Sequence, residues 1–350
     1  MSSWNNLYKN LREELVAGRK AVLVTELKSL PDSSTVFNKL LFSESELFSE
    51  SASNDQNHKI AKAALEQGKL QLFDDKTGNL HFAEPFFPES RLIILGGGHI
   101  AKPLVEFSTK CGFAVTVVDD RPTFANTERF PYAKSVICEG FDRCFPRLNI
   151  NRSAFVVIIT RGHKHDLDCL RQVLRFDTSY TGMIGSRRRV RAAMEQMLGE
   201  GFSKEKLDAV RAPIGLDINA QTPEEISVSI LSELIKYKRR LASANWPELD
   251  REVLDELFKE EHEPRALITI VETKGSVPRN IGAKMIVWPY GKIIGSIGGG
   301  CSESAVIQTA YDVIRNGGFK TQDIDMTGDT AADEGMVCGG TMRVVIERLD

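Results

Sequence analysis

A glycine-rich turn around position 97 is the first segment whose residue types suggest chemistry. The motif Gly96-x-Gly98-x-x-Ala101 follows the apolar run 92–95 and opens a stretch with helical spacing. Glycines between a strand and a helix let a phosphate reach backbone N–H groups at the positive end of the helix dipole. The pattern predicts a nucleotide-type site at Gly96 and Gly98, with a plain sharp turn as the alternative. His99 either contacts the ligand or caps the helix.

Polar residues follow two of the predicted strands. Asp119 ends the next apolar run, about 20 residues after the turn, where a carboxylate accepts ribose hydroxyls. Its alternative role is to cap a helix together with Asp120. Arg161 and His163 follow a later strand, and ligands of parallel sheets lie beyond the carboxyl ends of the strands. We therefore expect Arg161, His163 and Asp166 to face the same crevice as Gly98.

Two further segments have the residue types of ligand sites. His163 and His165 with Asp166 offer the donors of a metal site, but no distant further ligand accompanies them, so we expect a polar loop and no metal. Ser186 and Arg187 combine a hydroxyl N-cap with a cation at a helix start, which suits an anion. A solvated basic helix face is the alternative for Ser186 and Arg187.

Thiols lie next to consecutive glycines near the C-terminus. Consecutive glycines cost backbone entropy that an ordinary turn does not require. A helix that starts after Gly299 and Gly300 lowers the pKa of the Cys301 thiol and makes it a better nucleophile or soft-metal ligand. We assign Cys301, Cys338 and Glu303 as candidate catalytic residues and the two glycines as cofactor-binding. Inert buried cysteines are the alternative.

The elements that must position these residues alternate between apolar strands and amphipathic helices. The predicted strands are 92–95, 113–118, 133–138, 154–160 and 181–184, and the predicted helices are 101–111, 166–176, 186–197 and 223–240. Such alternation predicts a parallel sheet of Rossmann type. After a linker at 241–250 come a charged helix at 252–261, strands from 266, a hairpin around 289–291, a helix ending at 314 and a closing strand.

The two ends of the chain form a faint internal repeat. Run 21–31 parallels 266–278, run 39–43 parallels 292–296, the helix at 60–65 parallels 306–314, and 80–86 parallels the last strand. Only the C-terminal copy keeps the glycine-rich turns. The predicted fold class is α/β: a Rossmann-type domain at 89–242, flanked by two smaller α/β domains. These are a degenerate one at 1–88 and an intact one at 251–350.

Composition narrows the class of protein. The 350 residues are 42% hydrophobic and 27% charged, with a net charge of −3, which is ordinary for a globular protein and gives no electrostatic drive toward nucleic acid. No apolar run approaches the roughly 20 residues that span a bilayer. The six cysteines contain no CxxC pair, so reduced thiols and a cytoplasmic location are expected.

Taken together, the motifs resemble the XdhC/CoxI family of xanthine dehydrogenase accessory proteins. The small-domain motifs are 272–279, 298–303 and 337–340; the Rossmann motifs are 96–99, 118–122 with Arg121, 160–163 with Asp166, 185–187, 213–217 and 223–226. In the usual family arrangement the small domain precedes the Rossmann domain, whereas here the intact copy follows it. A homodimer, or a pairing of the two copies within one chain, would restore the usual geometry.

The resemblance implies an accessory factor that binds molybdenum cofactor of the molybdopterin type. The cofactor would lie in a crevice between the Rossmann-type and C-terminal domains and pass to a xanthine dehydrogenase-like apoenzyme. Its phosphate would lie on the turn at Gly96 and Gly98, with Arg187 and His163 orienting the anion. Cys301 or Cys338 would meet the molybdenum or dithiolene end. A sulfur-donating enzyme would be a second partner, and purine catabolism the context.

Two other functions remain open on the sequence. An NAD(P)-dependent oxidoreductase is favoured by Asp119 and the glycine turn, but the sequence offers no evident hydride partner. A xanthine dehydrogenase-associated subunit is the other interpretation. The cysteine spacings of iron–sulfur clusters and a flavin domain are absent from the sequence, so we expect no independent hydroxylation of xanthine.

Overall fold

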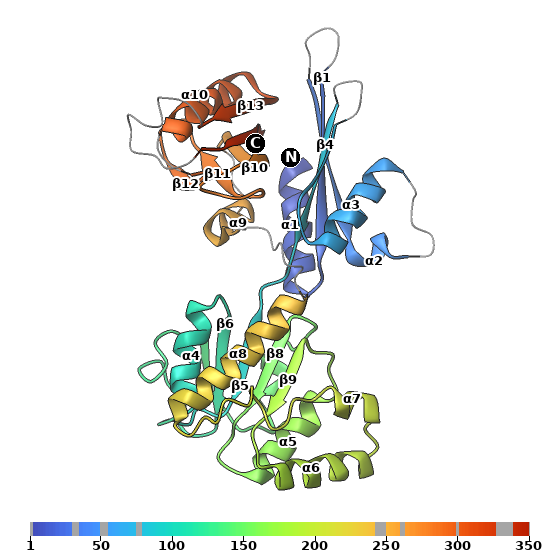
Figure 1. Ribbon diagram of the computed structural model, residues 1–350, viewed down its shortest axis with the longest axis vertical. Helices are drawn as coiled ribbons and strands as arrows, with labels where there is room; N and C mark the ends of the chain where they lie inside the picture. The colour runs from blue at the N-terminus through green and yellow to red at the C-terminus, as the bar shows by residue number, and fades with distance from the viewer. Residues whose placement is uncertain are drawn as a thin grey trace. The chain divides into compact units, whose positions relative to one another are not determined.

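The computed structural model describes residues 3–29, 35–49, 55–74, 79–241, 250–259, 263–298, 301–326 and 339–349. The chain divides into two compact units. One is Pro88–Ala242, and the other combines Met1–Phe87 with Ser243–Asp350. In Figure 1 the second unit carries the colours of both ends of the colour bar, because its two parts come from opposite ends of the chain.

The unit Pro88–Ala242 is built on a five-stranded parallel sheet with strand order β7-β6-β5-β8-β9. The strands are β5 (Arg91–Leu95), β6 (Ala114–Asp119), β7 (Ser135–Cys138), β8 (Ala154–Ile158) and β9 (Tyr180–Met183). The chain adds strands outward on one side of β5 and then returns to add β8 on the other. This topology confirms the predicted Rossmann-type sheet and places its switch point between β5 and β8.

Helices cover both faces of this sheet, which explains the apolar runs of its central strands β5 and β8. On one face α4 (Ala101–Lys110) and α8 (Pro223–Leu241) pack on Leu92 and Ile94. On the other face α5 (His163–Val173) and α6 (Arg187–Gly199) pack on Ile93 and Leu95. The shorter elements are the 3₁₀ turn Phe145–Arg147 and α7 (Lys204–Asp208).

The second unit contains two antiparallel sheets. The N-terminal sheet has the order β2-β1-β4-β3, and the C-terminal sheet has the order β12-β11-β10-β14-β13. The N-terminal strands are β1 (Ala21–Ser29), β2 (Thr35–Ser43), β3 (Gln71–Asp74) and β4 (Leu80–Phe86). The C-terminal strands are β10 (Arg265–Lys274), β11 (Lys284–Val287), β12 (Ile293–Gly295), β13 (Phe319–Asp325) and β14 (Thr341–Leu349). The helices are α1 (Ser3–Val16), α2 (Glu44–Leu47), α3 (Gln56–Gln67), α9 (Arg251–Leu257) and α10 (Cys301–Asn316).

Strand register shows how the two copies of the repeat correspond. Thr25 of β1 pairs with Lys39 of β2 and with Phe82 of β4. Likewise Thr269 of β10 pairs with Lys284 of β11, and with β14 on its other side. The predicted match of 39–43 with 292–296 is therefore wrong, and 39–43 corresponds to 284–288. The stretches 284–288 and 292–296 both start with a lysine that precedes apolar residues. Only 284–288 pairs with the central strand of its sheet, as 39–43 does, and this pairing identifies it as the counterpart.

Apolar side chains of the two copies share common cores. One core combines Leu11 and Leu23 of the N-terminal copy with Leu267 and Trp288 of the C-terminal copy. A second core combines Phe82 with residues of β10 and β14. The two copies therefore pack on each other within one chain, as one of the two arrangements expected from the sequence.

Several elements were not expected from the sequence. They are α1, α2, α7, β3 and β13. The edge strand β13 shows why: its side chains are mostly exposed or half-buried, without the strict alternation that predicts a strand. Among the described residues, no helix is long and apolar enough to cross a membrane.

Candidate functional site

The carboxyl edge of the parallel sheet gathers most of the residues singled out in the sequence. Gly96 follows β5, Asp120 follows β6, Arg161 follows β8 and Ser186 follows β9. Because all five strands run in one direction, these residues lie at the same edge. The loops after β5 and β8 border the switch point, where ligands of open α/β sheets bind.

The three glycines of the turn differ in what surrounds them. Gly96 has φ +117, and a Cβ there would lie 2.3 Å from the Ile159 oxygen; a Cβ at Gly97 would lie 2.0 Å from the Phe124 oxygen. The backbone packing of the protein itself therefore requires these two glycines. A Cβ at Gly98 would meet nothing within 4 Å. Gly98 is thus the position where a ligand can approach the backbone.

The Asp119 carboxylate is buried and saturated with hydrogen bonds. Its Oδ2 accepts from Gly97 N at 2.9 Å and from Arg121 Nη2 at 3.0 Å, while its Oδ1 accepts from Arg121 N and Nε at 3.1 and 2.9 Å. A carboxylate has about four acceptor positions, and the side chain is 1% exposed. The residue predicted to accept ribose hydroxyls instead ties the glycine turn to β6.

Asp119 also links the fold to pH. Burial alone would raise the pKa of Asp119, but the hydrogen bonds from Arg121 and Gly97 outweigh burial and hold that pKa below its ordinary value of 3.8. A lowered folded-state pKa stabilises the fold above the unfolded-state pKa, and this stabilisation is lost as the pH falls through the folded-state value.

Asp119→Asn is expected to lower the free energy of unfolding of this unit by about 2–3 kcal/mol at pH 7, because charge-assisted hydrogen bonds are lost. The deficit relative to the unmodified protein should begin to shrink below about pH 4, where Asp119 becomes protonated in the unfolded state, and should disappear as the pH falls through the lower pKa of the native carboxylate. Denaturant unfolding between pH 3 and pH 7 measures both effects. Asp120→Asn is the control, with a change below about 1 kcal/mol. Parallel pH profiles for the unmodified protein and Asp119→Asn would contradict this account.

Arg129 and Phe124, which the sequence did not single out, also contact the turn and its neighbour Arg121. Arg129 Nε donates to the Gly97 oxygen at 3.1 Å, and Arg129 Nη2 donates to the Gly98 oxygen at 3.2 Å. The Arg121 guanidinium lies 3.8 Å from the ring centre of Phe124. Both Phe124 and Arg129 belong to an irregular loop, in which no spacing pattern marks them. Arg121 and Arg129 place positive charge beside the turn.

An ion pair spans the carboxyl end of β5. Arg161, after β8, donates to both oxygens of Asp120, after β6, with Nη2–Oδ2 at 2.9 Å. Because β5 lies between β6 and β8, this pair crosses the strand end from which the glycine turn departs. A cavity of about 390 Å³ borders Asp120 and the start of α5 at Lys164 and His165.

The loop after β8 is held by Asp166. This buried carboxylate accepts from Thr160 N at 3.1 Å and from Thr160 Oγ1 at 2.6 Å. Burial raises the pKa of Asp166 despite these hydrogen bonds. His163 is the first residue of α5 and is half-buried. Asp166 therefore positions Arg161 and His163 through the loop backbone.

At the end of β9, Ser186 caps α6. Its hydroxyl accepts from Arg189 N at 3.4 Å. Arg187, Arg188 and Arg189 are exposed in the first turn of this helix, and His99, at the start of α4, is also exposed. These side chains are accessible to an anion in solvent.

In the C-terminal copy, Glu303 organises the loop before α10. Its Oε1 accepts from Ser296 Oγ at 2.6 Å, from Ile297 N at 3.0 Å and from Gly298 N at 3.3 Å. Through these bonds Glu303 positions the glycine-rich segment. Cys301 is the first residue of α10, and the structure does not describe its side chain. Gly299, Gly300 and Cys338 lie outside the described residues.

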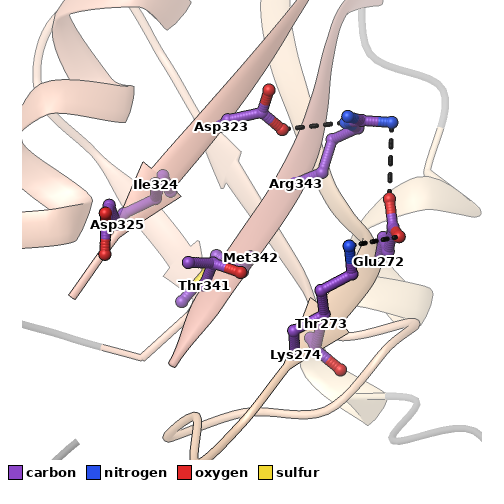
Figure 2. Close-up of a pocket in the computed structure, with 9 residues that line it drawn as sticks. All are labelled: Glu272, Thr273, Lys274, Asp323, Ile324, Asp325, Thr341, Met342 and Arg343. Atoms are coloured by element: carbon purple, nitrogen blue, oxygen red, sulfur yellow. Dashed lines mark hydrogen bonds and ion pairs between the residues drawn. The ribbon is translucent and has the colours of Figure 1, made fainter. Parts of the chain in front are cut away.

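Figure 2 shows a pocket at the ends of β10, β13 and β14. Its volume is about 310 Å³. A chain of ion pairs runs along it, from Asp323 to Arg343 at 2.8 Å, on to Glu272 at 3.3 Å and then to Lys274 at 4.0 Å. Glu272 follows a bulge in β10, a device that re-aims side chains next to binding sites. The pocket joins motif 272–279 to the start of β14.

The fold and this edge define an α/β protein with a Rossmann-type domain and two further antiparallel sheets. Residues 92–234 match the family model of the XdhC Rossmann domain, and residues 258–325 match that of the XdhC and CoxI family. The chain belongs to the XdhC and CoxI family, as the motifs predicted.

Two curated relatives and one solved structure are similar to this chain. The chain is 30% identical over 168 residues to a Bacillus subtilis protein described as a probable xanthine dehydrogenase subunit, covering 48% of each chain. It is also 30% identical over 149 residues to the uncharacterized protein YqeB of Escherichia coli, covering 42% of this chain and 27% of that one. The chain thus spans less than half of both curated relatives. A crystal structure of a xanthine dehydrogenase from Bacillus halodurans is similar with a TM-score of 0.50 and 28% identity, covering 72% of this chain and 70% of that one.

Proposed function

We propose that this protein is an accessory factor that binds molybdenum cofactor of the molybdopterin type and delivers it to a xanthine dehydrogenase-like apoenzyme. Membership of the XdhC and CoxI family supports an accessory role. The relative and the solved structure that carry xanthine dehydrogenase in their names support the class of client.

The observation that carries the proposal is the open space at Gly98. A Cβ there would meet nothing within 4 Å, at the switch point of the sheet and at the start of a ten-residue helix. Arg161 lies at the same edge. This donor set fits a phosphate monoester, which pairs with arginine and with backbone amides at a helix start.

In this proposal the residues of the chain bind the cofactor and orient it. The turn at Gly96 and Gly98 takes the phosphate, and Arg161, His163 and Arg187 neutralise its charge. Cys301 and Cys338 are the proposed contacts for the other end of the ligand. When bound, the cofactor supplies molybdenum and dithiolene chemistry to the client. A sulfur-donating enzyme and a second copy of this chain are further proposed partners.

The NAD(P)-dependent alternative has less support. It needs a carboxylate at the end of β6 that is free to accept ribose hydroxyls, and the Asp119 carboxylate already accepts four hydrogen bonds. Steady turnover of NADH by the purified protein would nonetheless favour this alternative, or that of a xanthine dehydrogenase-associated subunit if turnover appeared only with that enzyme.

The test is mass spectrometry, with metal analysis, of small molecules released when the natively purified protein is denatured. We expect a phosphorylated pterin and molybdenum, both lost from Gly98→Asp because a carboxylate would occupy the phosphate position. Gly199→Asp is the matched control, since that glycine is exposed with nothing near its Cβ position. Cys301→Ala should lose the metal. Full retention of ligand by both Gly98→Asp and Cys301→Ala would refute the site.

A further inference from the structure

Two buried ion pairs join the N-terminal and C-terminal copies. Lys39 of β2 contacts Glu347 of β14, with Nζ and Oε1 2.8 Å apart and both side chains at most 1% exposed. Lys284 of β11 contacts Glu84 of β4, again with both side chains buried. Unpaired charges cannot remain in such an apolar interior, so each copy requires the other.

The two pairs are related by the repeat. Lys39 and Lys284 occupy the same register position, opposite Thr25 and Thr269 of the central strands. Glu84 lies opposite Leu23, two residues before Thr25, and Glu347 lies opposite Leu267, two residues before Thr269. In each pair the lysine comes from one copy and the glutamate from the other. The two lysines lie on corresponding strands, and so do the two glutamates.

Such reciprocal exchange is the hallmark of a two-fold, isologous interface, in which residue i of one partner contacts residue j of the other and the reverse. The apolar contacts follow the same plan. The helix that precedes the first strand of each copy, α1 in one and α9 in the other, contributes to the shared core through Leu11 and Val253. The contact therefore has the form of a homodimer interface, although it lies within one chain.

The N-terminal copy lacks the glycine-rich motif of the C-terminal copy. Its helix α3 starts after Asp55, whose carboxylate accepts from His58 N at 2.8 Å. In the C-terminal copy the residue before α10 is Gly300. A carboxylate at the helix start occupies the position an anion would take. The N-terminal copy therefore has the interface residues without the glycine-rich motif.

We infer that the N-terminal copy is a built-in partner for the C-terminal copy. It fills the face through which the C-terminal copy would otherwise pair with a second molecule, so this face is closed within one chain and does not take part in dimerisation. The inference goes beyond the proposed function and is independent of any ligand.

A double-substitution cycle in the full-length protein tests the inference. Lys39→Met or Glu347→Leu alone leaves a buried charge without its partner and should lower the melting temperature by on the order of 10 °C. Both substitutions in one chain should bring it back to within about 3 °C, since an apolar pair replaces the ion pair at little cost. If the single variants fail to fold, folding of the double variant is itself evidence that the second substitution restores stability.

Two comparisons separate a contact within one chain from a contact between chains. The recovery should be the same at 1 and 100 μM protein, and co-expressing Lys39→Met chains with Glu347→Leu chains should restore nothing. The exposed pair Lys110 and Glu106 is the control, with no coupling expected for Lys110→Met and Glu106→Leu. Recovery in the mixed chains, a recovery that differs between 1 and 100 μM protein, or no recovery in the double variant would overturn the inference.

Discussion

Gly97→Ala is expected to destabilise the Rossmann-type unit by about 3 kcal/mol or more, whereas Gly98→Ala should change its stability by less than about 1 kcal/mol. The added Cβ at position 97 would lie 2.0 Å from the Phe124 carbonyl oxygen, a backbone atom that cannot rotate away. At position 98 the same Cβ meets open space. Amide hydrogen exchange in β5 and β6 follows this unit separately from the other.

The same two variants should separate fold from binding. Gly98→Ala places a methyl group where the ligand approaches the backbone, so it should weaken binding of inorganic pyrophosphate at least about tenfold while the unit stays folded. Isothermal titration calorimetry measures the affinity. Unchanged binding by Gly98→Ala would show that the ligand does not approach the backbone at this glycine, whatever the stability of Gly97→Ala.

Arg161→Gln is expected to weaken pyrophosphate binding about tenfold to hundredfold, because a charge-assisted hydrogen bond contributes about 1.5–3 kcal/mol. Asp120→Asn should have the opposite effect. The Arg161–Asp120 pair is partly exposed and such pairs contribute about 0–1 kcal/mol, so a phosphate can displace the carboxylate. Removing that competition should strengthen binding up to about fivefold.

Titration of both variants with pyrophosphate decides the role of this ion pair. Arg152→Gln is the matched control: it removes the same charge at an 80% exposed side chain, just before the amino end of β8, and should leave the affinity unchanged. If Asp120→Asn weakened binding, Asp120 would itself contact the ligand rather than compete with it. Equal affinities for Arg161→Gln and the unmodified protein would remove Arg161 from the site.

The parallel sheet was predictable because its signals are local. The strands β5, β6 and β8 are apolar runs that are almost entirely buried, and a glycine turn after β5 with Asp119 at the end of β6 marks the first βαβ unit. The role of Asp119 was not predictable in the same way. Spacing gives the position of a carboxylate but not its hydrogen-bond donors, and here Gly97 and Arg121 take every acceptor position.

Contacts between distant segments explain the other differences between the sequence-based predictions and the structure. The lysine at 292 resembles Lys39 in its neighbours, yet Lys284 is the true counterpart, because strand pairing and not local sequence fixes the register. Arg129 reaches the turn from 31 residues away through a loop without periodicity. The sequence predicts Glu303 as a candidate catalytic residue, and its hydrogen bonds to the loop before α10 show that it also positions this loop.

The discontinuous second unit has a consequence for biosynthesis. Lys39 leaves the ribosome 308 residues before Glu347, the carboxylate that neutralises it. At about 5–20 residues per second this interval is on the order of 15–60 s. The Rossmann-type unit, which is continuous in sequence, can fold during that time. The N-terminal sheet meanwhile keeps an apolar face uncovered until the C-terminal copy has been synthesised.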